Sequence, residues 1–133
     1  MATQTAAVPG RFTFLRVATA LQTLSLFFQA VTAGMLLSSS HGYAMHDIGS
    51  RVMYGASMVY VLAAILAWRP GGGSPRPILY ASGFLALASV QVILGIMHMS
   101  SLHIFLGILM FGLSVLALHG ALRTAPGRTT GTH

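Results

Sequence analysis

Two histidines, His46 and His103, occupy matching places in two similar stretches of the chain. Each is followed, at offsets of seven, eight, nine and eleven residues, by a methionine, an aromatic residue, a glycine and a serine. These residues are Met53, Tyr54, Gly55 and Ser57 in the first copy, and Met110, Phe111, Gly112 and Ser114 in the second. Imidazole nitrogens are ligands for iron and copper. The repeat therefore predicts a site at which two imidazoles hold one metal between them.

The residues around each histidine suggest how such a site is built. At 100° per residue, offsets of seven and eleven return to within about 20° of the histidine, so methionine and serine share its stripe. We expect Met53 and Met110 to pack against a flat ligand or a neighbouring helix rather than to act as ligands. Gly49 and Gly107 lie one turn from the histidines. A glycine at this place predicts a flat, open space beneath each imidazole.

A haem suits two such histidines better than a direct contact between them. In a four-helix bundle, the histidine-bearing helices would form a diagonal of about 11 to 14 Å. Two imidazoles reaching inward from this separation can ligate one iron but are too far apart to hydrogen-bond to each other. The chain has no cysteine, so the haem would be noncovalent haem b. Arg51 could pair with a haem propionate.

Copper is an alternative that the sequence leaves open. Thioether and imidazole groups gather at the expected outer rim of the bundle, and this donor set suits Cu(I). The rim residues are Met35, His41, Met45, Met97, His98 and Met99. His41 or His98 could also replace one of the two proposed ligands. A haem site and a Cu(I) site would use the same histidines, so the spacing of the histidines in the sequence does not distinguish the two kinds of site.

The composition excludes several other kinds of chemistry. Of the 133 residues, 55% are hydrophobic and 6% are charged, whereas about a quarter are charged in soluble domains. The chain has no cysteine, and Asp47 is its only acidic residue. This excludes a disulfide scaffold, a thiolate metal site and catalysis by paired carboxylates. We therefore expect a membrane protein that is not an enzyme on its own.

Four apolar segments are long enough to carry these residues across a membrane. A helix needs about 20 residues to span a hydrocarbon core of about 30 Å. Short connections rich in Gly, Pro and Ser favour antiparallel neighbours. The predicted fold is an all-α membrane protein, an up-down antiparallel bundle of four transmembrane helices formed by two repeated hairpins. The expected parts are a cytoplasmic N-terminal segment at 1–15, a transmembrane domain at 16–123 with spans at about 16–38, 48–68, 78–97 and 102–122, and a disordered tail at 124–133.

The arginines predict the orientation of the bundle. Six of the seven fall on one side of the spans, and Arg51 alone lies at the other end. By the positive-inside rule, both termini are cytoplasmic and the histidines lie near the outer leaflet. Because the positive charges flank apolar spans, the formal net charge of +6 does not indicate a nucleic-acid partner. Arginine without lysine suggests a bacterial source and hence the bacterial inner membrane.

Residues 91–95, Gln-Val-Ile-Leu-Gly, precede residues 102–107, Leu-His-Ile-Phe-Leu-Gly. This run resembles the last two helices of one half of the heme A synthase family, where a Gln-x-x-x-Gly helix precedes a helix that opens with a haem-ligating histidine. The second span, with His46 and Arg51, is similar to the second helix of such a half. The whole chain also resembles a group of small actinobacterial four-helix membrane proteins.

The resemblance covers about residues 21–123 and implies that His46 and His103 are axial haem ligands. The family usually places its second-helix histidine directly before an arginine, and a catalytic glutamate one turn earlier. Here Ser50 precedes Arg51, and the chain has no glutamate. Oxidation of a haem methyl group is therefore not expected of this chain.

Three functions remain as expectations from the sequence. The first is a single-haem membrane protein for electron transfer, haem sensing or haem handling, because two histidine ligands leave no open position on iron. The second is a Cu(I)-binding membrane protein, and the third is an accessory subunit of a larger complex. The expected partners are the lipid bilayer, a redox protein or respiratory complex, and a second copy of the chain.

Overall fold

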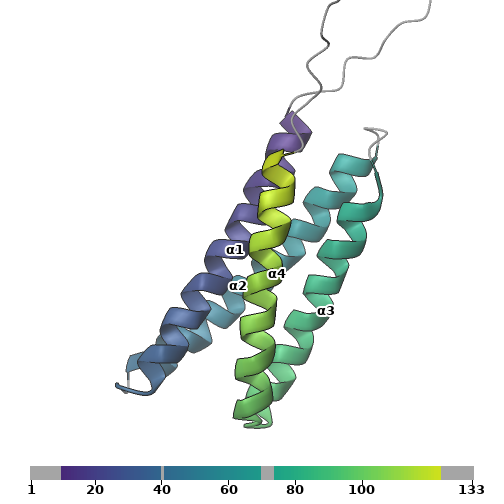
Figure 1. The fold of residues 1–133 in the computed structure, drawn as a ribbon. Coiled ribbons are helices and arrows are strands. Elements are labelled where there is room, and N and C mark those ends of the chain that lie inside the picture. Colours follow the sequence, from purple (N-terminus) through teal and green to yellow (C-terminus); the bar gives the residue numbers. More distant parts are fainter. Residues whose placement is uncertain (1–9, 40, 70–73, 124–133) are drawn as a thin grey trace, which may run out of the picture.

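The computed structural model describes residues 10–39, 41–69 and 74–123, and these residues are all-helical apart from short turns (Figure 1). The four helices are α1 (Gly10–Leu36), α2 (His41–Trp68), α3 (Arg76–Ile96) and α4 (Ser100–Arg123). The predicted all-α class is confirmed. The predicted tail at 124–133 and most of the N-terminal segment lie outside the described residues.

Each helix is long and apolar enough to cross a membrane. The candidate spans are 21 to 28 residues long, and about 20 residues suffice to cross the hydrocarbon core. Large apolar side chains are exposed on all four helices, for example Phe27, Leu62, Ile93 and Ile108. Such surfaces are suited to contact with lipid rather than water, because lipid tails solvate apolar side chains.

Helix α2 begins earlier than the sequence predicts, at His41 instead of about residue 48. Gly42 makes this start possible, since a Cβ at this residue would lie within 2.7 Å of backbone atoms of Met35 and Leu36. The absence of a side chain lets the first turn of α2 pack directly against the end of α1. As a result His46 lies in the second turn of α2, whereas His103 lies in the first turn of α4 as expected.

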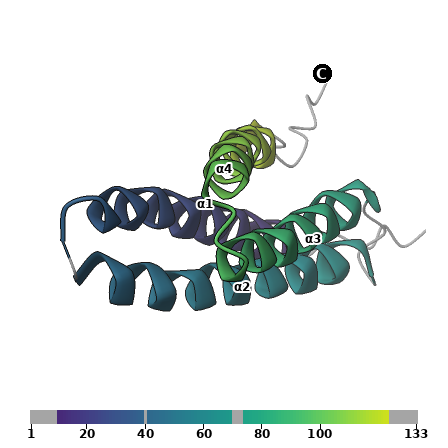
Figure 2. The ribbon, with the colours of Figure 1, turned by 90° about the horizontal axis from the view of Figure 1, so that it is seen from below.

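Each helix packs against two others. Helix α1 contacts α2 and α4, and α3 contacts the same two helices. Among the described residues, the backbones of α2 and α4 do not approach each other, and Figure 2 shows the two helices on opposite sides of α1. The two histidine-bearing helices therefore occupy the predicted diagonal.

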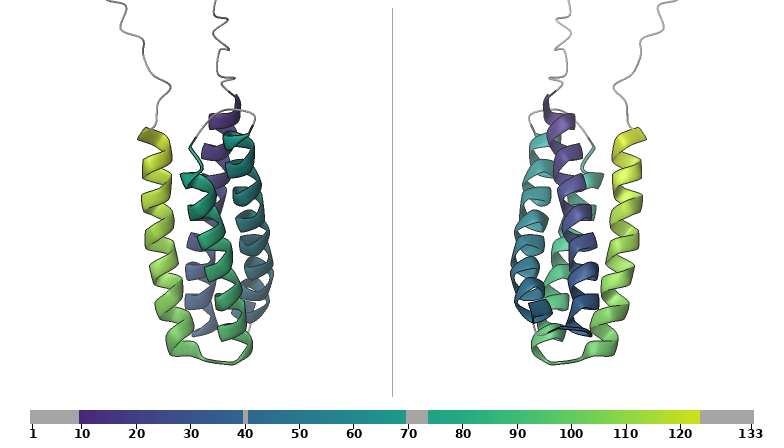
Figure 3. Two further views of the ribbon diagram at one scale, coloured as in Figure 1. Left: turned by 90° about the vertical axis from the view of Figure 1, so that its right-hand side faces the viewer. Right: turned by 90° about the vertical axis from the view of Figure 1, so that its left-hand side faces the viewer.

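Both histidines lie at the same end of the molecule. Figure 3 shows the α3–α4 turn at the same end as the last turn of α1 and the first turn of α2. The first turn of α1 and the last turns of α2 and α4 lie at the opposite end. His46 and His103 are close to the starts of α2 and α4, so the fold brings them to one level.

The interior contains many small side chains. Ala63, Ala64, Ala81 and Ala88 are completely buried. Small residues let the backbones of membrane helices approach closely. Buried polar side chains are present as well, namely Thr19, Gln22, Thr23, Thr32, Ser57, Gln91 and Ser114. The bundle therefore combines close helix contacts with a set of internal hydrogen bonds.

Candidate metal centre

His46 of α2 and His103 of α4 lie next to each other across the diagonal of the bundle. Their ring centroids are 5.9 Å apart and the ring planes are inclined at 69°, so the two rings form a direct edge-on contact that the sequence does not predict. Both side chains are half-buried. The structure thus brings together the two residues that the internal repeat singles out.

Helix α3 holds the His103 ring. Its Nδ1 atom lies 3.0 Å from the backbone carbonyl oxygen of Gln91. A carbonyl oxygen can only accept, so Nδ1 carries the proton and donates it. The ring also packs on Gly95, where a Cβ would lie 3.4 Å from the ring Cε1 atom. In the neutral ring, this arrangement leaves the lone pair on Nε2.

Helix α1 holds the His46 ring in a similar way. Its Nδ1 atom lies 3.1 Å from Oγ1 of Thr32. The Thr32 hydroxyl also lies 3.1 Å from the carbonyl oxygens of Phe28 and Gln29, one turn back on α1. In the tautomer with the proton on Nδ1, His46 donates to the Thr32 oxygen, and the single hydroxyl proton of Thr32 goes to one of these carbonyls. The neutral His46 ring therefore also carries its lone pair on Nε2.

The distance between the two rings is compatible with two imidazoles on one metal ion. Metal-ligating histidines almost always donate the other ring N–H to a carbonyl, carboxylate or water, which fixes the tautomer. Two imidazole nitrogens on opposite sides of one ion, each about 2 Å from it, place the ring centroids about 6 Å apart. The observed separation is 5.9 Å. Among the described residues, no group of three or more His, Cys, Asp or Glu side chains is arranged to hold a metal.

The sequence predicts open space next to Gly49 and Gly107, but the structure places a glutamine side chain there. A Cβ at Gly49 would collide with the side-chain amide of Gln29, and one at Gly107 would lie 3.0 Å from Nε2 of Gln91. The space is filled because α1 packs on α2 and α3 packs on α4. Each packing partner places a glutamine opposite the glycine. Gln29 Nε2 also donates to the His46 carbonyl oxygen at 3.3 Å. Each glycine therefore accommodates a glutamine amide.

Met53 and Met110 are buried in the bundle, with 4% and 0% of their surfaces exposed. Ser57 and Ser114 on the same stripes are also buried, so the repeated stripe faces the interior. Seven residues of helix correspond to about 10 Å along the axis. The methionines therefore lie too far along their helices to share an ion with the histidines, and they pack in the core.

Arg51 does not lie beside the histidines. Five residues of helix turn it about 140° around α2 from His46. Its guanidinium Nη2 atom donates to the Asp47 carboxylate at 3.0 Å, and the side chains are 78% and 48% exposed. The structure thus pairs Arg51 with the only acidic residue of the chain, on the outer face of α2.

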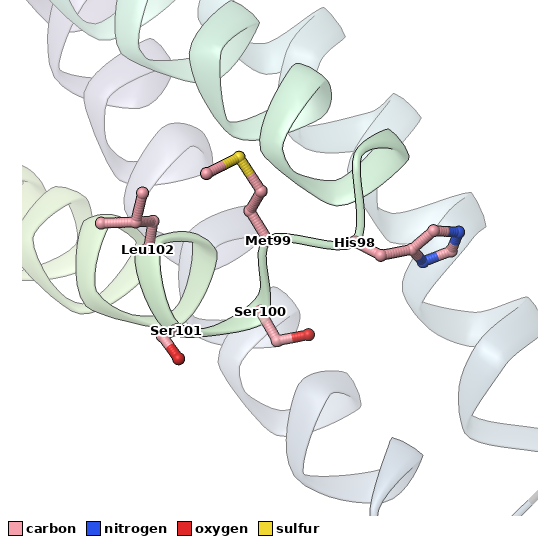
Figure 4. Close-up of a pocket in the computed structure, with 5 residues that line it drawn as sticks. All are labelled: His98, Met99, Ser100, Ser101 and Leu102. Atoms are coloured by element: carbon pink, nitrogen blue, oxygen red, sulfur yellow. The ribbon is translucent and has the colours of Figure 1, made fainter.

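His98 and Met99 of the expected rim do not point toward each other. His98 lies in the α3–α4 turn with a positive φ of 54°, next to a shallow pocket that is also lined by Met99 and Leu102 (Figure 4). The side chains of His98 and Met99 extend in opposite directions. His41 is exposed at the start of α2.

Thr32 is the site residue that the sequence reasoning missed. It carries no metal-ligating group, and its role depends on the register of the α1–α2 hairpin. A signal was nevertheless present, because Thr32 and His46 each lie seven residues from Ser39 in the connection between the helices. Residues equally far from a tight antiparallel turn lie opposite each other.

Comparison with known proteins adds no relative, since no protein family, no curated protein and no solved structure matches the chain. The candidate site is therefore defined by the two imidazoles and the groups that orient them.

Proposed function

We propose that this chain is an integral membrane protein that holds one haem b between His46 and His103. The observation that carries the proposal is the pair of imidazoles, 5.9 Å apart, each with Nδ1 bound to a neighbouring helix. Because Nδ1 is engaged in both rings, both Nε2 atoms remain as ligands. One iron between the rings uses both lone pairs.

Haem suits this pair better than a bare ion does. Structural zinc takes four protein ligands, and other hard or borderline ions take more. The described residues offer two imidazoles and no larger cluster of His, Cys, Asp or Glu. A porphyrin brings four nitrogen ligands of its own, so that two histidines complete the coordination of iron.

The residues of this chain would hold the group and tune its chemistry. Bound haem supplies a one-electron iron couple. His46 and His103 would both hold the iron, and two protein ligands favour electron transfer, haem sensing or haem handling over oxygen activation. The buried Gln91 Oε1 atom, which has no hydrogen-bond partner among the described residues, offers a polar contact next to the His103 anchor. A redox protein or respiratory complex is the expected partner.

We place the four helices in a bacterial inner membrane as an up-down antiparallel bundle with both termini in the cytoplasm. The distribution of charge supports this orientation. Arg16, Arg69, Arg76 and Arg123 lie towards the ends of α1, α2, α3 and α4 that face away from the histidines. The positive-inside rule assigns that end to the cytoplasm, and the histidine pair then lies near the outer leaflet.

Cu(I) is the second candidate for the same pair. Soft thioethers and imidazoles favour Cu(I), and the histidine end exposes Met45, Met97 and Met99 with 42%, 62% and 41% of their surfaces accessible. These side chains could pass an ion to the pair. Retention of stoichiometric Cu(I) without haem would support this candidate.

A role as an accessory subunit is the third candidate. Only Met110 and Ser114 of α4 are buried, so most of this apolar helix is left for lipid, a partner protein or a second copy. Copurification of a constant partner without any cofactor would support this role.

An absorption spectrum tests the haem proposal directly. We expect the detergent-purified protein from cells with ample haem to show a sharp Soret band, and sharp α and β bands after dithionite. The double variant His46→Ala/His103→Ala should lose haem, whereas His119→Ala, which alters an exposed histidine on α4, should keep the wild-type spectrum. A featureless wild-type spectrum, or an unchanged spectrum in both single histidine variants, would refute the proposal.

A further inference from the structure

The end of the bundle that faces away from the histidines carries an excess of positive charge. Arg16, Arg69, Arg76 and Arg123 lie there, whereas Asp47, the only acidic residue of the chain, lies at the histidine end. We propose that two of these arginines, Arg69 and Arg76, bind the phosphodiester headgroup of an anionic phospholipid where α2 meets α3. This lipid site does not depend on the histidine pair or on haem.

Arg69 and Arg76 flank the connection between two neighbouring helices. Helix α2 packs against α3, and the last turn of α2 lies at the same end of the molecule as the first turn of α3 (Figure 3). Arg69 directly follows the last residue of α2, and Arg76 is the first residue of α3. Both side chains are exposed. Packed helices have axes about 8 to 10 Å apart, a separation across which two arginine side chains can reach one phosphate.

The guanidinium groups of Arg69 and Arg76 have N–H donors available for a ligand. Within the part of the chain that the structure describes, neither group forms a hydrogen bond or an ion pair. The guanidinium of Arg69 stacks on the Trp68 ring, with Cζ 4.6 Å from the ring centroid. Stacking uses the flat face of the guanidinium and leaves the N–H groups in its plane accessible. A phosphate can accept two parallel N–H bonds from one arginine.

The other two arginines of this end already stabilise the fold. Arg16 Nε donates to the carbonyl oxygen of Ala121 at 3.0 Å. Arg123 lies in the last turn of α4, where a cation stabilises the negative end of the helix dipole. Arg76 lies instead in the first turn of α3, which contains no acidic residue and where a cation is unfavourable. Arg76 therefore does not stabilise its own helix, and a bound anion would offset its charge.

The surroundings of both arginines suit a lipid better than a free phosphate. Trp68 is half-buried at the end of α2, and tryptophan is typical of the level of lipid headgroups. Leu79 and Tyr80, one turn into α3 from Arg76, are 73% and 60% exposed. A headgroup at the arginines places its acyl chains beside these side chains, along a helix that is long enough to cross a membrane. A free phosphate would contact the arginines alone.

Trp68 is the only tryptophan of the chain, so its fluorescence reports on lipids beside the two arginines. The full chain is reconstituted in phosphatidylcholine vesicles that contain either brominated phosphatidylglycerol or brominated phosphatidylcholine, because bromine quenches tryptophan at short range. We expect phosphatidylglycerol to bind next to Trp68 at least about fivefold more tightly than phosphatidylcholine, the scale of one arginine at an anionic surface. Equal quenching by the two brominated lipids would overturn the proposal.

Variants show whether the preference comes from this pair of arginines. Arg76→Gln leaves the contact of Arg69 with Trp68 in place and should lower the preference severalfold, and Arg69→Gln/Arg76→Gln should abolish it. Arg51→Gln removes an arginine at the opposite end and should keep the wild-type preference. An unchanged preference in the double variant, or an equal loss in Arg51→Gln, would overturn the proposal. None of these variants changes a histidine, so failure of the haem proposal would not alter the result.

Inorganic phosphate distinguishes a lipid from a soluble anion at the same arginines. Phosphate, compared with chloride at equal ionic strength, should leave the quenching by brominated phosphatidylglycerol unchanged, because the acyl chains keep the headgroup at the site. Displacement of the lipid by phosphate would assign the two arginines to a soluble anion and overturn the lipid site.

Discussion

The Gln91 side-chain amide covers Gly107, with its Nε2 atom 3.0 Å from the position that a Cβ on that glycine would occupy. Gln29 covers Gly49 in the other hairpin. One glutamine thus packs on one glycine in each half of the repeat, a turn away from each histidine. The helix pairs that carry the imidazoles approach closely because these two positions have no side chain.

Substitution of these glycines should reveal the difference between the two contacts. Gly49→Ala forces the Gln29 amide aside and breaks its hydrogen bond to the His46 carbonyl. Overpacking typically costs about 1 to 3 kcal/mol, so we expect a clear loss of stability. Gly107→Ala requires a shift of only a few tenths of an ångström in the flexible end of Gln91, and the higher helix propensity of alanine offsets most of it. Unfolding in mixed detergent micelles measures both effects.

Gly55 and Gly112 are matched controls for that experiment. They lie on α2 and α4, and within the described structure a Cβ at either would have no neighbour within 4 Å. Alanine at these positions should leave stability unchanged or raise it by up to about 1 kcal/mol. If Gly55→Ala destabilised the protein as much as Gly49→Ala, the contact with Gln29 would not be the cause.

Gln22 and Ser57 should be coupled in the middle of the bundle. Ser57 Oγ donates to Gln22 Oε1 at 3.1 Å, and both side chains are buried. Gln22 Nε2 has no partner among the described residues. Ser57→Ala therefore leaves the whole amide without a partner, and we expect a loss of about 1 kcal/mol.

A double-mutant cycle separates this coupling from simple loss of packing. Gln22→Leu removes the buried amide together with its unpartnered atom, so Ser57→Ala should cost little in that background. Ser89→Ala, which removes a hydroxyl of α3 that contacts Tyr54 of α2, is the control and should add independently to Gln22→Leu. Additive effects of Gln22→Leu and Ser57→Ala would contradict the prediction.

The sequence predicts the parts of this molecule that depend on periodicity, but not those that depend on hairpin register. His46 and His103 share a level and a diagonal as expected, because two similar hairpins place equivalent residues alike. The contacts of Thr32 and of both glutamines require the register between helices. That register depends on Gly42, which admits the end of α1 against the first turn of α2. Residue-type patterns within a single helix carry no such information.

Arg16 should hold the C-terminal end of α4. Its Nε atom donates to the backbone carbonyl oxygen of Ala121 in the last turn of α4 at 3.0 Å. Arg16→Gln should increase hydrogen exchange in the last turn of α4 severalfold, whereas Arg76→Gln, a change at the start of α3, should leave that turn unaffected. Unchanged exchange in the last turn would show that the contact does not hold it.

Arg51 should be dispensable for haem binding, because it points away from the histidines and pairs with Asp47. An exposed ion pair one helical turn apart contributes less than about 0.5 kcal/mol to stability. We expect Arg51→Gln to change the haem affinity by less than threefold, and Asp47→Asn to behave alike, since neither group touches an imidazole. Haem titration of the apoprotein measures both variants.

A large loss of affinity in Arg51→Gln but not in Asp47→Asn would mean that Arg51 leaves Asp47 to bind a propionate. A similar loss in both variants would instead assign the effect to the outer turn of α2 that the ion pair stabilises.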